Sequence, residues 1–242
     1  MPQTWCPISN RMHYKHLFFD MDGTVTPSRS KIHPKMKDFL ISLDQTIGII
    51  SGSHNDQMAW QMDGVEVICM GQNGNHAIHT DGTELWFDKL SDDEKREILS
   101  HSDCVWGACT HAVPDEDDLI EDRGSQISLS IYGHNADTTE KKACDGDFKK
   151  RAALLEQFPF ESATVEVKMG GSTCLDYFRK GRNKGYNIAR LIEHQGWNKD
   201  ECIFFGDALF PGGNDETVVG VIEAVQVADD MDCLKKLKAK LS

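Results

Sequence analysis

Several features that the sequence lacks narrow the class of protein. Its eight cysteines include no Cys-x-x-Cys pair, which argues against structural zinc, and 242 residues are too many for a small disulfide-bonded scaffold. We therefore expect reduced thiols. No apolar stretch approaches the length of a membrane span, and the amino terminus has no signal-like apolar run after its charges. These absences favour a cytoplasmic protein.

Basic residues are also scarce, with 26 Lys and Arg against 39 Asp and Glu and a formal net charge of −13. Nucleic acids and anionic membrane surfaces are themselves negatively charged, so this balance disfavours both as partners. The sequence contains neither an internal repeat nor a low-complexity linker. Its length is sufficient for one domain with a sizeable insertion.

Two carboxylates follow a short apolar run near the start of the chain. Residues 16–19 predict a buried strand, and the glycine and threonine after Asp20 and Asp22 predict a turn. Side chains two apart in a strand share a side, so we expect the turn to direct Asp22 away from Asp20. One carboxylate could then bind a cation or attack an electrophile while the other exchanges a proton. The alternative is a solvated turn, since Asp-Gly is common there.

A second apolar run ends in the same way far downstream. Residues 202–205 lead through a glycine into Asp207, and Asp215 follows in a glycine-rich block. If both runs are neighbouring strands of one parallel sheet, the two pairs of acids gather where such sheets bind ligands. So many like charges repel unless a divalent cation lies among them. The expected cofactor is Mg²⁺, which prefers oxygen ligands and bridges to phosphate.

Two further polar residues fit a phosphate site. Ser51 follows the apolar run 47–50, and its hydroxyl could donate a hydrogen bond to a phosphate oxygen. Lys184 lies in the segment 182–192, whose apolar residues have helical spacing. A lysine near a helix N-terminus opposes the helix dipole, so we expect its charge to pair with an acid or a phosphate. The alternatives are a strand-end turn for Ser51 and a solvated surface position for Lys184.

Helical patterns alternate with the apolar runs. Residues 32–43 predict a helix with Pro34 near its first turn and apolar side chains on one face. Strands that alternate with helices imply right-handed crossovers and a parallel sheet. The fold class is therefore predicted as α/β with a Rossmann-like parallel-sheet core.

Taken together, the motifs resemble the haloacid dehalogenase superfamily of phosphotransferases. An Asp-x-Asp-Gly-Thr motif at 20–24, Ser51, Lys184 and a Gly-Asp pair at 206–207 occur in the order of that superfamily. Within it, the Pro-Gly-Gly-Asn-Asp block at 211–215 is similar to eukaryotic-type phosphomannomutases. The likeness spans most of the chain. It also includes the candidate substrate-binding residue Arg29.

The resemblance implies an aspartyl-phosphate mechanism. Asp20 would be the nucleophile and Asp22 the acid and base that serves the leaving oxygen, while Ser51 and Lys184 would bind the phosphoryl oxygens. Phosphoryl transfer requires positioning and charge neutralisation above all, which suits this set. The implied Mg²⁺ ligands are Asp20, the backbone carbonyl of Asp22 and Asp207, with Asp215 orienting them through hydrogen bonds.

Substrate choice is expected to reside in an inserted cap. A capping-box pattern at 91–94 predicts the start of a helix, and residues 125–132 and 163–169 alternate polar with apolar side chains, as half-buried strands do. We therefore expect an α+β cap with a small antiparallel sheet and helices on one face. The resemblance implies a catalytic core of residues 1–88 and 181–242, a cap of residues 89–180, and a possible homodimer formed through the cap.

The cap departs from the family at its phosphate grip, which consists of three arginines, a serine and an aspartate. Arg123 matches the first arginine and Asp176 the aspartate. His134 and Lys141 stand at the other arginine positions, and Cys174 stands at the serine. Lysine is a point charge and histidine is mostly neutral near pH 7, so both grip phosphate less well than arginine. The alternatives are surface charges for Arg123 and Lys141, a turn residue for His134 and a solvated acid for Asp176.

We expect a Mg²⁺-dependent phosphotransferase that acts on a small phosphorylated metabolite, most simply a sugar phosphate. A mutase must hold a second phosphate in the cap, so the weakened grip favours a phosphatase over a phosphomannomutase. A third hypothesis is a non-catalytic sugar-phosphate sensor. The complete acidic set argues against it, because binding alone requires no nucleophile.

Overall fold

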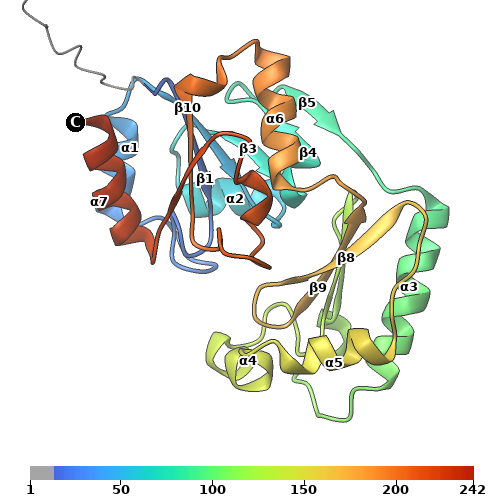
Figure 1. The fold of residues 1–242 in the computed structure, drawn as a ribbon. Coiled ribbons are helices and arrows are strands. Elements are labelled where there is room, and N and C mark those ends of the chain that lie inside the picture. The colour runs from blue at the N-terminus through green and yellow to red at the C-terminus, as the bar shows by residue number, and fades with distance from the viewer. Residues whose placement is uncertain (1–13) are drawn as a thin grey trace, which may run out of the picture.

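The computed structural model describes residues 14–242 and contains two β-sheets (Figure 1). The larger sheet has seven strands in the order β11-β10-β1-β2-β3-β4-β5, and the smaller has four in the order β6-β7-β9-β8. The predicted α/β class is confirmed. The prediction about a signal sequence concerns residues outside the described range.

The larger sheet is mostly parallel. Strands β11, β10, β1, β2 and β3 run parallel to one another, and β4 and β5 continue the sheet in antiparallel pairing. Parallel strands leave their carboxyl ends at a common edge, so the residues after β1, β2 and β10 share that edge. The strands are β1 (His16–Asp20), β2 (Thr46–Ile50), β3 (Ile68–Gly71), β4 (His76–Ile78), β5 (Glu84–Phe87), β10 (Cys202–Gly206) and β11 (Glu223–Gln226).

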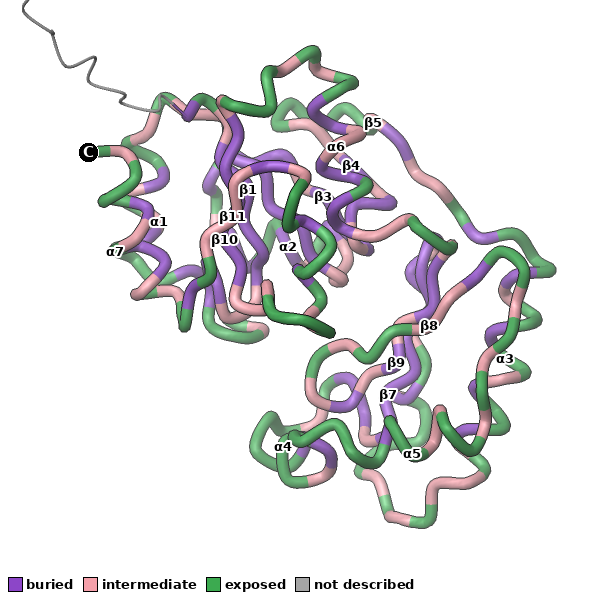
Figure 2. Tube along the Cα trace, in the orientation of Figure 1, coloured by how far each residue is buried: buried purple, intermediate pink, exposed green. Residues whose placement is uncertain are grey.

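Alternate side chains of the central strand β1 pack in separate apolar clusters on the two faces of this sheet. Leu17 and Phe19 pack in one apolar cluster with α1, α2 and α7, whereas Phe18 packs in a second cluster with α6. Figure 2 shows the central strands buried between these layers. The predicted helix over 32–43 is two residues shorter at each end, with Pro34 in its first turn. The helices are α1 (Pro34–Ile41), α2 (Asn55–Met62), α6 (Lys184–Gln195) and α7 (Asp230–Leu241).

The smaller sheet and three helices lie between β5 and α6 in the chain. Ser91 caps α3 and forms a reciprocal capping box with Glu94, as the pattern predicts. Apolar residues of β7, β8 and β9 pack with α3 and α5 in a third cluster. This part contains α3 (Asp92–Gly107), α4 (Thr138–Asp145), α5 (Lys149–Gln157), β6 (Ile120–Asp122), β7 (Gln126–Ser130), β8 (Val165–Gly170) and β9 (Cys174–Arg179). Below, this part is called the cap and the rest the core.

Hydrogen bonds join the cap to the core near the sheet edge. The side chain of Asn73 donates to Gln126 at 2.8 Å, and the Arg123 guanidinium donates to the carbonyl of Gly52 at 2.8 Å. Among residues 14–242, none of the helices combines the length and apolar character that a membrane crossing requires.

Candidate active site

Three of the four predicted acids meet at the carboxyl edge of the larger sheet. Asp20 is the last residue of β1, and Asp207 follows the neighbouring strand β10. Each of Asp20, Asp207 and Asp215 offers a carboxylate oxygen that lies within 4.8 Å of the other two. The parallel pairing of β1 with β10 thus brings together residues almost 190 positions apart in sequence.

Lys184 lies among these acids. Its ammonium donates to Asp20 Oδ1 at 2.5 Å and to Asp215 Oδ1 at 2.7 Å, and its side chain is 1% exposed. The solvated surface alternative for this lysine is therefore wrong. Burial opposes its charge, but Asp20 and Asp215 raise the pKa of Lys184 above the ordinary lysine value. The lysine is positively charged in this setting and fixes the orientation of both carboxylates.

The acidic group fits a hard divalent cation. Burial raises the pKa of Asp20 well above its ordinary value, and Asp215 and Asp207 add to this effect although Lys184 opposes it. Burial and Asp215 likewise raise the pKa of Asp207. Three carboxylates surround a single ammonium, so the group has more negative than positive charge and can accept a cation. Carboxylate oxygens are the donors that Mg²⁺ prefers. Asp20, Asp207 and Asp215 are the residues that could hold the ion.

The side chain of Asp22 points elsewhere, as the turn predicts. Its Oδ1 accepts hydrogen bonds from the backbone N–H of Arg29 at 2.6 Å and from the Gln61 side chain at 3.1 Å. Gly23 forms the turn with φ of 82°, and a Cβ there would lie 2.7 Å from a carboxylate oxygen of Asp207. Only glycine meets both conditions without strain. The turn therefore separates Asp22 from the acidic group and lets Asp207 approach the backbone.

Ser51 lies at the same sheet edge, directly after β2. The residue is buried, and its hydroxyl accepts a hydrogen bond from the backbone N–H of Ser53 at 3.2 Å. Within the described part of the chain, the hydroxyl donates to no protein group. Its proton is therefore available to an oxygen of a bound molecule.

The cap residues singled out from the sequence form a buried polar cluster. The Arg123 guanidinium donates to Glu121 Oε2 at 2.9 Å and, as described above, to the carbonyl of Gly52 in the core. His134 is fully buried, and its Nε2 lies 3.1 Å from the carbonyl oxygen of Ser128. Lys141 donates to the carbonyl of His134 at 2.8 Å. The alternatives that placed Arg123 and Lys141 on the surface are therefore wrong. His134 does lie in the bend between β7 and α4, but its side chain is buried there.

Charges within this cluster are balanced locally. Cys174 Sγ lies 3.8 Å from His134 Nδ1, and Glu121 Oε2 lies 3.7 Å from the same nitrogen. Burial lowers the pKa of His134, but contact with Cys174 and the charge of Glu121 outweigh it and raise that pKa above 6.5. Burial also lowers the pKa of Lys141. Asp176 is half-buried and accepts a hydrogen bond from the Ser128 hydroxyl at 2.6 Å, so it is not a simple solvated acid.

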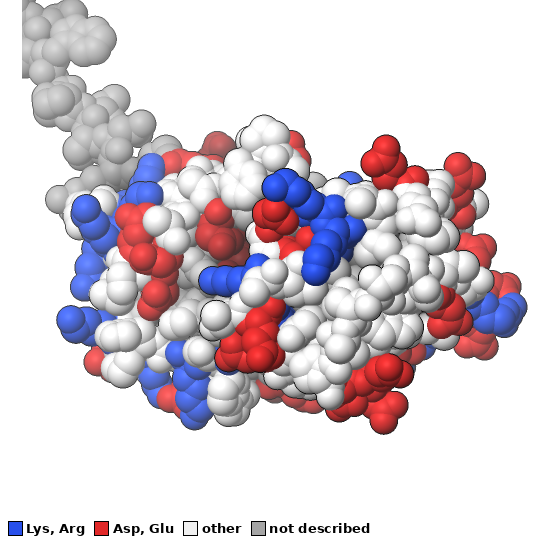
Figure 3. All heavy atoms as spheres, turned by 90° about the horizontal axis from the view of Figure 1, so that it is seen from below, with Lys and Arg blue, Asp and Glu red and all other residues white. Residues whose placement is uncertain are grey.

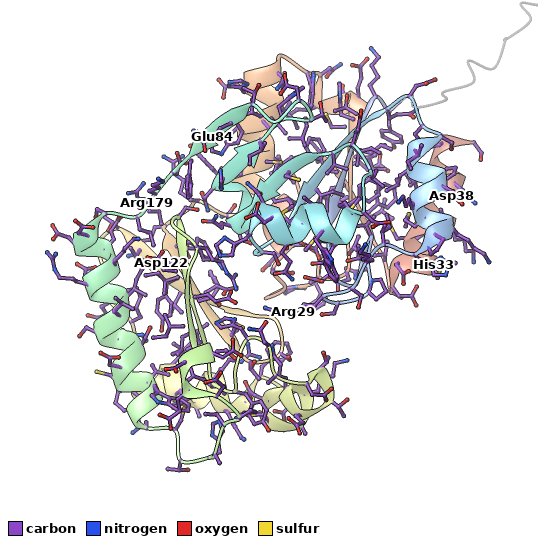
Figure 4. The ribbon with its side chains drawn as sticks, turned by 180° about the vertical axis from the view of Figure 1, so that it is seen from behind. Arg29, His33, Asp38, Glu84, Asp122 and Arg179 are labelled. Atoms are coloured by element: carbon purple, nitrogen blue, oxygen red, sulfur yellow. The ribbon has the colours of Figure 1, made fainter. Side chains whose placement is uncertain are left out.

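Arg29 lies at the core edge that faces the cap (Figure 4). Its φ is 48°, and its guanidinium lies 3.5 Å from the side-chain oxygen of Asn135 in the cap. Figure 3 shows a hollow on one face of the molecule, bordered by Lys and Arg side chains and with Asp and Glu side chains beside it. The surroundings of the hollow are thus more mixed in charge than the net charge of the chain suggests.

Sequence reasoning missed three residues of the site region. Gln61 orients Asp22 from the buried side of α2, Glu121 pairs with Arg123, and Gln126 links the cap to Asn73. Gln126 could have been found, because it occupies a polar position in the alternating strand at 125–132. Gln61 and Glu121 carry no such pattern.

Known proteins resemble this chain over nearly its whole length. A model of haloacid dehalogenase-like hydrolases matches residues 17–215. The phosphomannomutase of Arabidopsis thaliana is 27% identical over 91% of this chain and 94% of its own. Human phosphomannomutase 1 is 28% identical over 81% of this chain and 80% of its own. The crystal structure of a haloacid dehalogenase-like hydrolase from Bacteroides thetaiotaomicron superposes with a TM-score of 0.62, at 14% identity, over 95% of this chain and 100% of that one. The resemblance seen in the motifs is confirmed, and the chain belongs to the haloacid dehalogenase-like hydrolase family.

Proposed function

We propose that this protein is a Mg²⁺-dependent phosphatase that removes the phosphoryl group from a small sugar phosphate through an aspartyl-phosphate on Asp20. The observation that carries the proposal is the position of Asp20 at the end of β1. One of its carboxylate oxygens is held by Lys184, and Asp207 and Asp215 lie beside it. A sugar-phosphate sensor would require no such arrangement around a carboxylate.

Two displacements account for the reaction. Asp20 attacks phosphorus, the bond from phosphorus to the ester oxygen breaks, and Asp22 gives a proton to that oxygen. Water then attacks the phosphorus of the aspartyl-phosphate, Asp22 takes the proton from the water, and the bond to Asp20 breaks. Asp22 suits the role of acid and base, because Arg29 and Gln61 donate hydrogen bonds to one of its carboxylate oxygens and leave the other for proton exchange.

The remaining groups would position the phosphoryl oxygens. The Lys184 ammonium has three protons and uses two on Asp20 and Asp215, so one remains for a phosphoryl oxygen. Ser51 would donate its free hydroxyl proton. Asp20, the backbone carbonyl of Asp22 and Asp207 would hold Mg²⁺, with Asp215 in support, and the bound ion would neutralise charge that develops on the phosphoryl group.

The hydrogen bonds that the basic side chains of the cap already make within the protein favour hydrolysis over mutase action. Arg123 is bound by Glu121 and Gly52, and Lys141 is bound by the carbonyl of His134. A mutase must grip a second phosphate in the cap while the first is transferred. Arg123 directs three of its five N–H groups at these acceptors, so a second phosphate would compete with Glu121 for it, whereas Lys141 uses one of its three ammonium protons in this bond.

A hexose-phosphate mutase is the second candidate. Its support is the similarity to the phosphomannomutases of Arabidopsis and human over more than four fifths of the chain. Opening of the pair between Arg123 and Glu121 would be required to free an arginine for the second phosphate.

A screen of phosphosugars, with and without Mg²⁺, tests the proposal. Phosphate release that requires Mg²⁺ supports the phosphatase, isomerisation that requires a bisphosphate activator supports the mutase, and binding without turnover supports the sensor. The variant Asp20→Asn should abolish turnover. The variant Asp44→Asn, which removes an exposed carboxylate in the core, should retain it.

A further inference from the structure

An open groove lies where the cap meets the core, beside the linker between β5 and α3. Its volume is about 430 Å³, within the range of about 300–1,000 Å³ that is usual for small-molecule sites. None of the four candidate active-site acids lines it, and neither does Ser51. Asp122, labelled in Figure 4, lines it from the end of the cap nearest the core. The groove is therefore separate from the site around Asp20.

The walls of the groove are more basic than the chain as a whole. They contain three cationic side chains and one carboxylate, whereas the whole chain has a net charge of −13. The carboxylate belongs to Asp122 and is already paired with Lys95 at 2.6 Å. An acidic protein that gathers cations around one groove favours an anion there. The cationic side chains are those of Lys89, Lys95 and Arg123, and the walls also contain His54 and His76.

Lys89 supplies the positive charge that is not already used. Its ammonium lies 4.7 Å from the centre of the Phe87 ring and has no carboxylate partner among residues 14–242. Arg123, in contrast, is already bonded within the protein, as described above. Lys95 and Asp122 form a pair whose side chains are 30% and 45% exposed, and such a pair is weak enough to exchange for a ligand.

A buried amide directs an unpaired donor into the same groove. Gln72 lines the groove, although only 1% of the residue is exposed. Its Oε1 accepts hydrogen bonds from the backbone N–H of Ser125 at 2.8 Å and from the Ser125 hydroxyl at 2.5 Å. A backbone N–H can only donate, so the oxygen must be at that end of the amide and Nε2 at the other. Within the described part of the chain, Nε2 has no acceptor, and it is not sealed from solvent. The group that Gln72 presents to the groove is therefore a hydrogen-bond donor.

The ring of His54 is a second unpaired group. His54 precedes α2 and makes no side-chain hydrogen bond to the start of that helix, nor to any other residue between 14 and 242. Burial and the charge of Arg123 lower the pKa of His54, Glu121 and Asp56 oppose this effect, and His76 adds to it. The ring is therefore mostly neutral near pH 7 and donates from one nitrogen. A bound anion would oppose the charge of Arg123 and raise this pKa.

We propose that this groove binds the phosphate group of a small molecule, held by the Gln72 amide, the His54 ring and the Lys89 ammonium. Phosphate is the matching group, because its oxygens accept several hydrogen bonds at once and its charge pairs with a cation. Inorganic phosphate and a phosphate ester share this chemistry. The inference does not depend on the proposed function.

A ligand in the groove would bridge the two parts of the molecule. Gln72 and His54 belong to the core and Lys89 to the linker, whereas Asp122 and Arg123 belong to the cap. A ligand that touches these parts together favours the arrangement in which they meet. Phosphate binding would therefore bias the position of the cap on the core.

The ring of His54 is a direct probe of the groove. Its NMR signal, assigned by its loss in His54→Gln, is followed against pH in EDTA, with inorganic phosphate, with glucose 6-phosphate, and with sodium chloride at equal ionic strength. EDTA leaves the acidic group around Asp20 without a cation, which disfavours phosphate there. We expect saturating phosphate or ester to raise the pKa of His54 by about one relative to chloride. The compound that saturates at the lower concentration identifies the class of ligand.

Two variants each remove one contact and leave the rest of the groove intact. Gln72→Glu keeps the oxygen that accepts from Ser125 and replaces the donor by a second oxygen, which repels an anion. Lys89→Met removes the unused charge from an exposed residue. Each should raise about tenfold the phosphate concentration that half-shifts the His54 signal. Lys168→Met is the matched control, because Lys168 is also exposed but lies outside the groove, and binding should stay within about twofold of the wild type.

Two results would overturn the inference. If phosphate and ester shift the His54 signal no more than chloride does, the groove holds no anion. If they shift it as strongly in Lys89→Met and Gln72→Glu as in the wild type, phosphate binds elsewhere, for example at Ser51, three residues before His54. Should Gln72→Glu fail to fold, Lys89→Met decides alone, because an exposed side chain is not required for packing. Each result is independent of whether the protein releases phosphate from sugar phosphates, so this inference and the proposed function fail separately.

Discussion

Replacement of Lys184 by methionine should strongly destabilise the protein when no divalent cation is present. The change leaves Asp20 and Asp215 buried without their shared counter-charge, at side-chain exposures of 7% and 0%. Removal of one partner of a buried ion pair typically costs about 3–5 kcal/mol. For a chain of this size, that cost lowers Tm by about 6–20 °C.

Added Mg²⁺ should stabilise this variant more than it stabilises the wild type. The variant site has one positive charge fewer, so its affinity for the cation is higher, and each tenfold gain in affinity adds about 1.4 kcal/mol at saturating cation. Thermal and urea unfolding, with EDTA and with Mg²⁺, measure both effects. Since bound Mg²⁺ should restore folding, we expect the comparison to remain possible if the variant is unstable without it.

Lys15→Met is the matched control for Lys184→Met. Lys15 forms an ion pair with Glu201 at 2.6 Å, but the two side chains are 55% and 31% exposed. An exposed pair contributes less than about 1 kcal/mol, and its loss should not depend on Mg²⁺. The reasoning is refuted if Lys184→Met costs no more than Lys15→Met, or if Mg²⁺ stabilises it less than it stabilises the wild type.

Three further predictions concern packing, pH and assembly. Gly185→Ala should cost about 1–3 kcal/mol of stability and lower activity, because its Cβ would collide with the backbone oxygen of Thr217 and displace the start of α6. Gly107→Ala is the control and should cost nothing, since a Cβ at that position meets no neighbour. Urea unfolding compares the stability of the two variants. The hydrogen bonds from Arg179 lower the pKa of Glu94 from 4.5 to about 2, so the stability they give is full above about pH 5 and is lost as the pH falls from there to about 2. Glu94→Gln should therefore be less stable than the wild type by about 1–2 kcal/mol at pH 7, with a difference that shrinks toward pH 3; a constant difference would contradict the ion pair. Measurement of the sedimenting mass at several protein concentrations tests the homodimer that is expected to form through the cap. A protein that remains monomeric at every concentration would contradict it.

Much of the fold was accessible from the sequence because local patterns agree with the long-range structure. The apolar runs at 16–19, 47–50 and 202–205 became β1, β2 and β10, and the capping box at 91–94 opens α3. The dipole argument for Lys184 also succeeded, since a cation at a helix N-terminus requires a partner that outweighs the dipole.

Other features could not be predicted because tertiary packing decides them. His134 and Lys141 are polar residues in a polar segment, and only the packing of the cap buries them together. Gln61 reaches Asp22 from a helix whose sequence gives no sign of that contact. Gln126 occupies a polar position in an alternating strand, but its hydrogen bond with Asn73 emerges only when β7 is placed against the core.

The central claim is that Asp20 carries the phosphoryl group during turnover. Mass spectrometry of enzyme quenched in acid during turnover, followed by peptide mapping, tests it most directly. The account predicts a phosphorylated peptide modified at Asp20, present with Mg²⁺ and sugar phosphate and missing in Asp20→Asn. Turnover with no phosphorylated residue at any time point, or with the phosphoryl group on another residue, would contradict it.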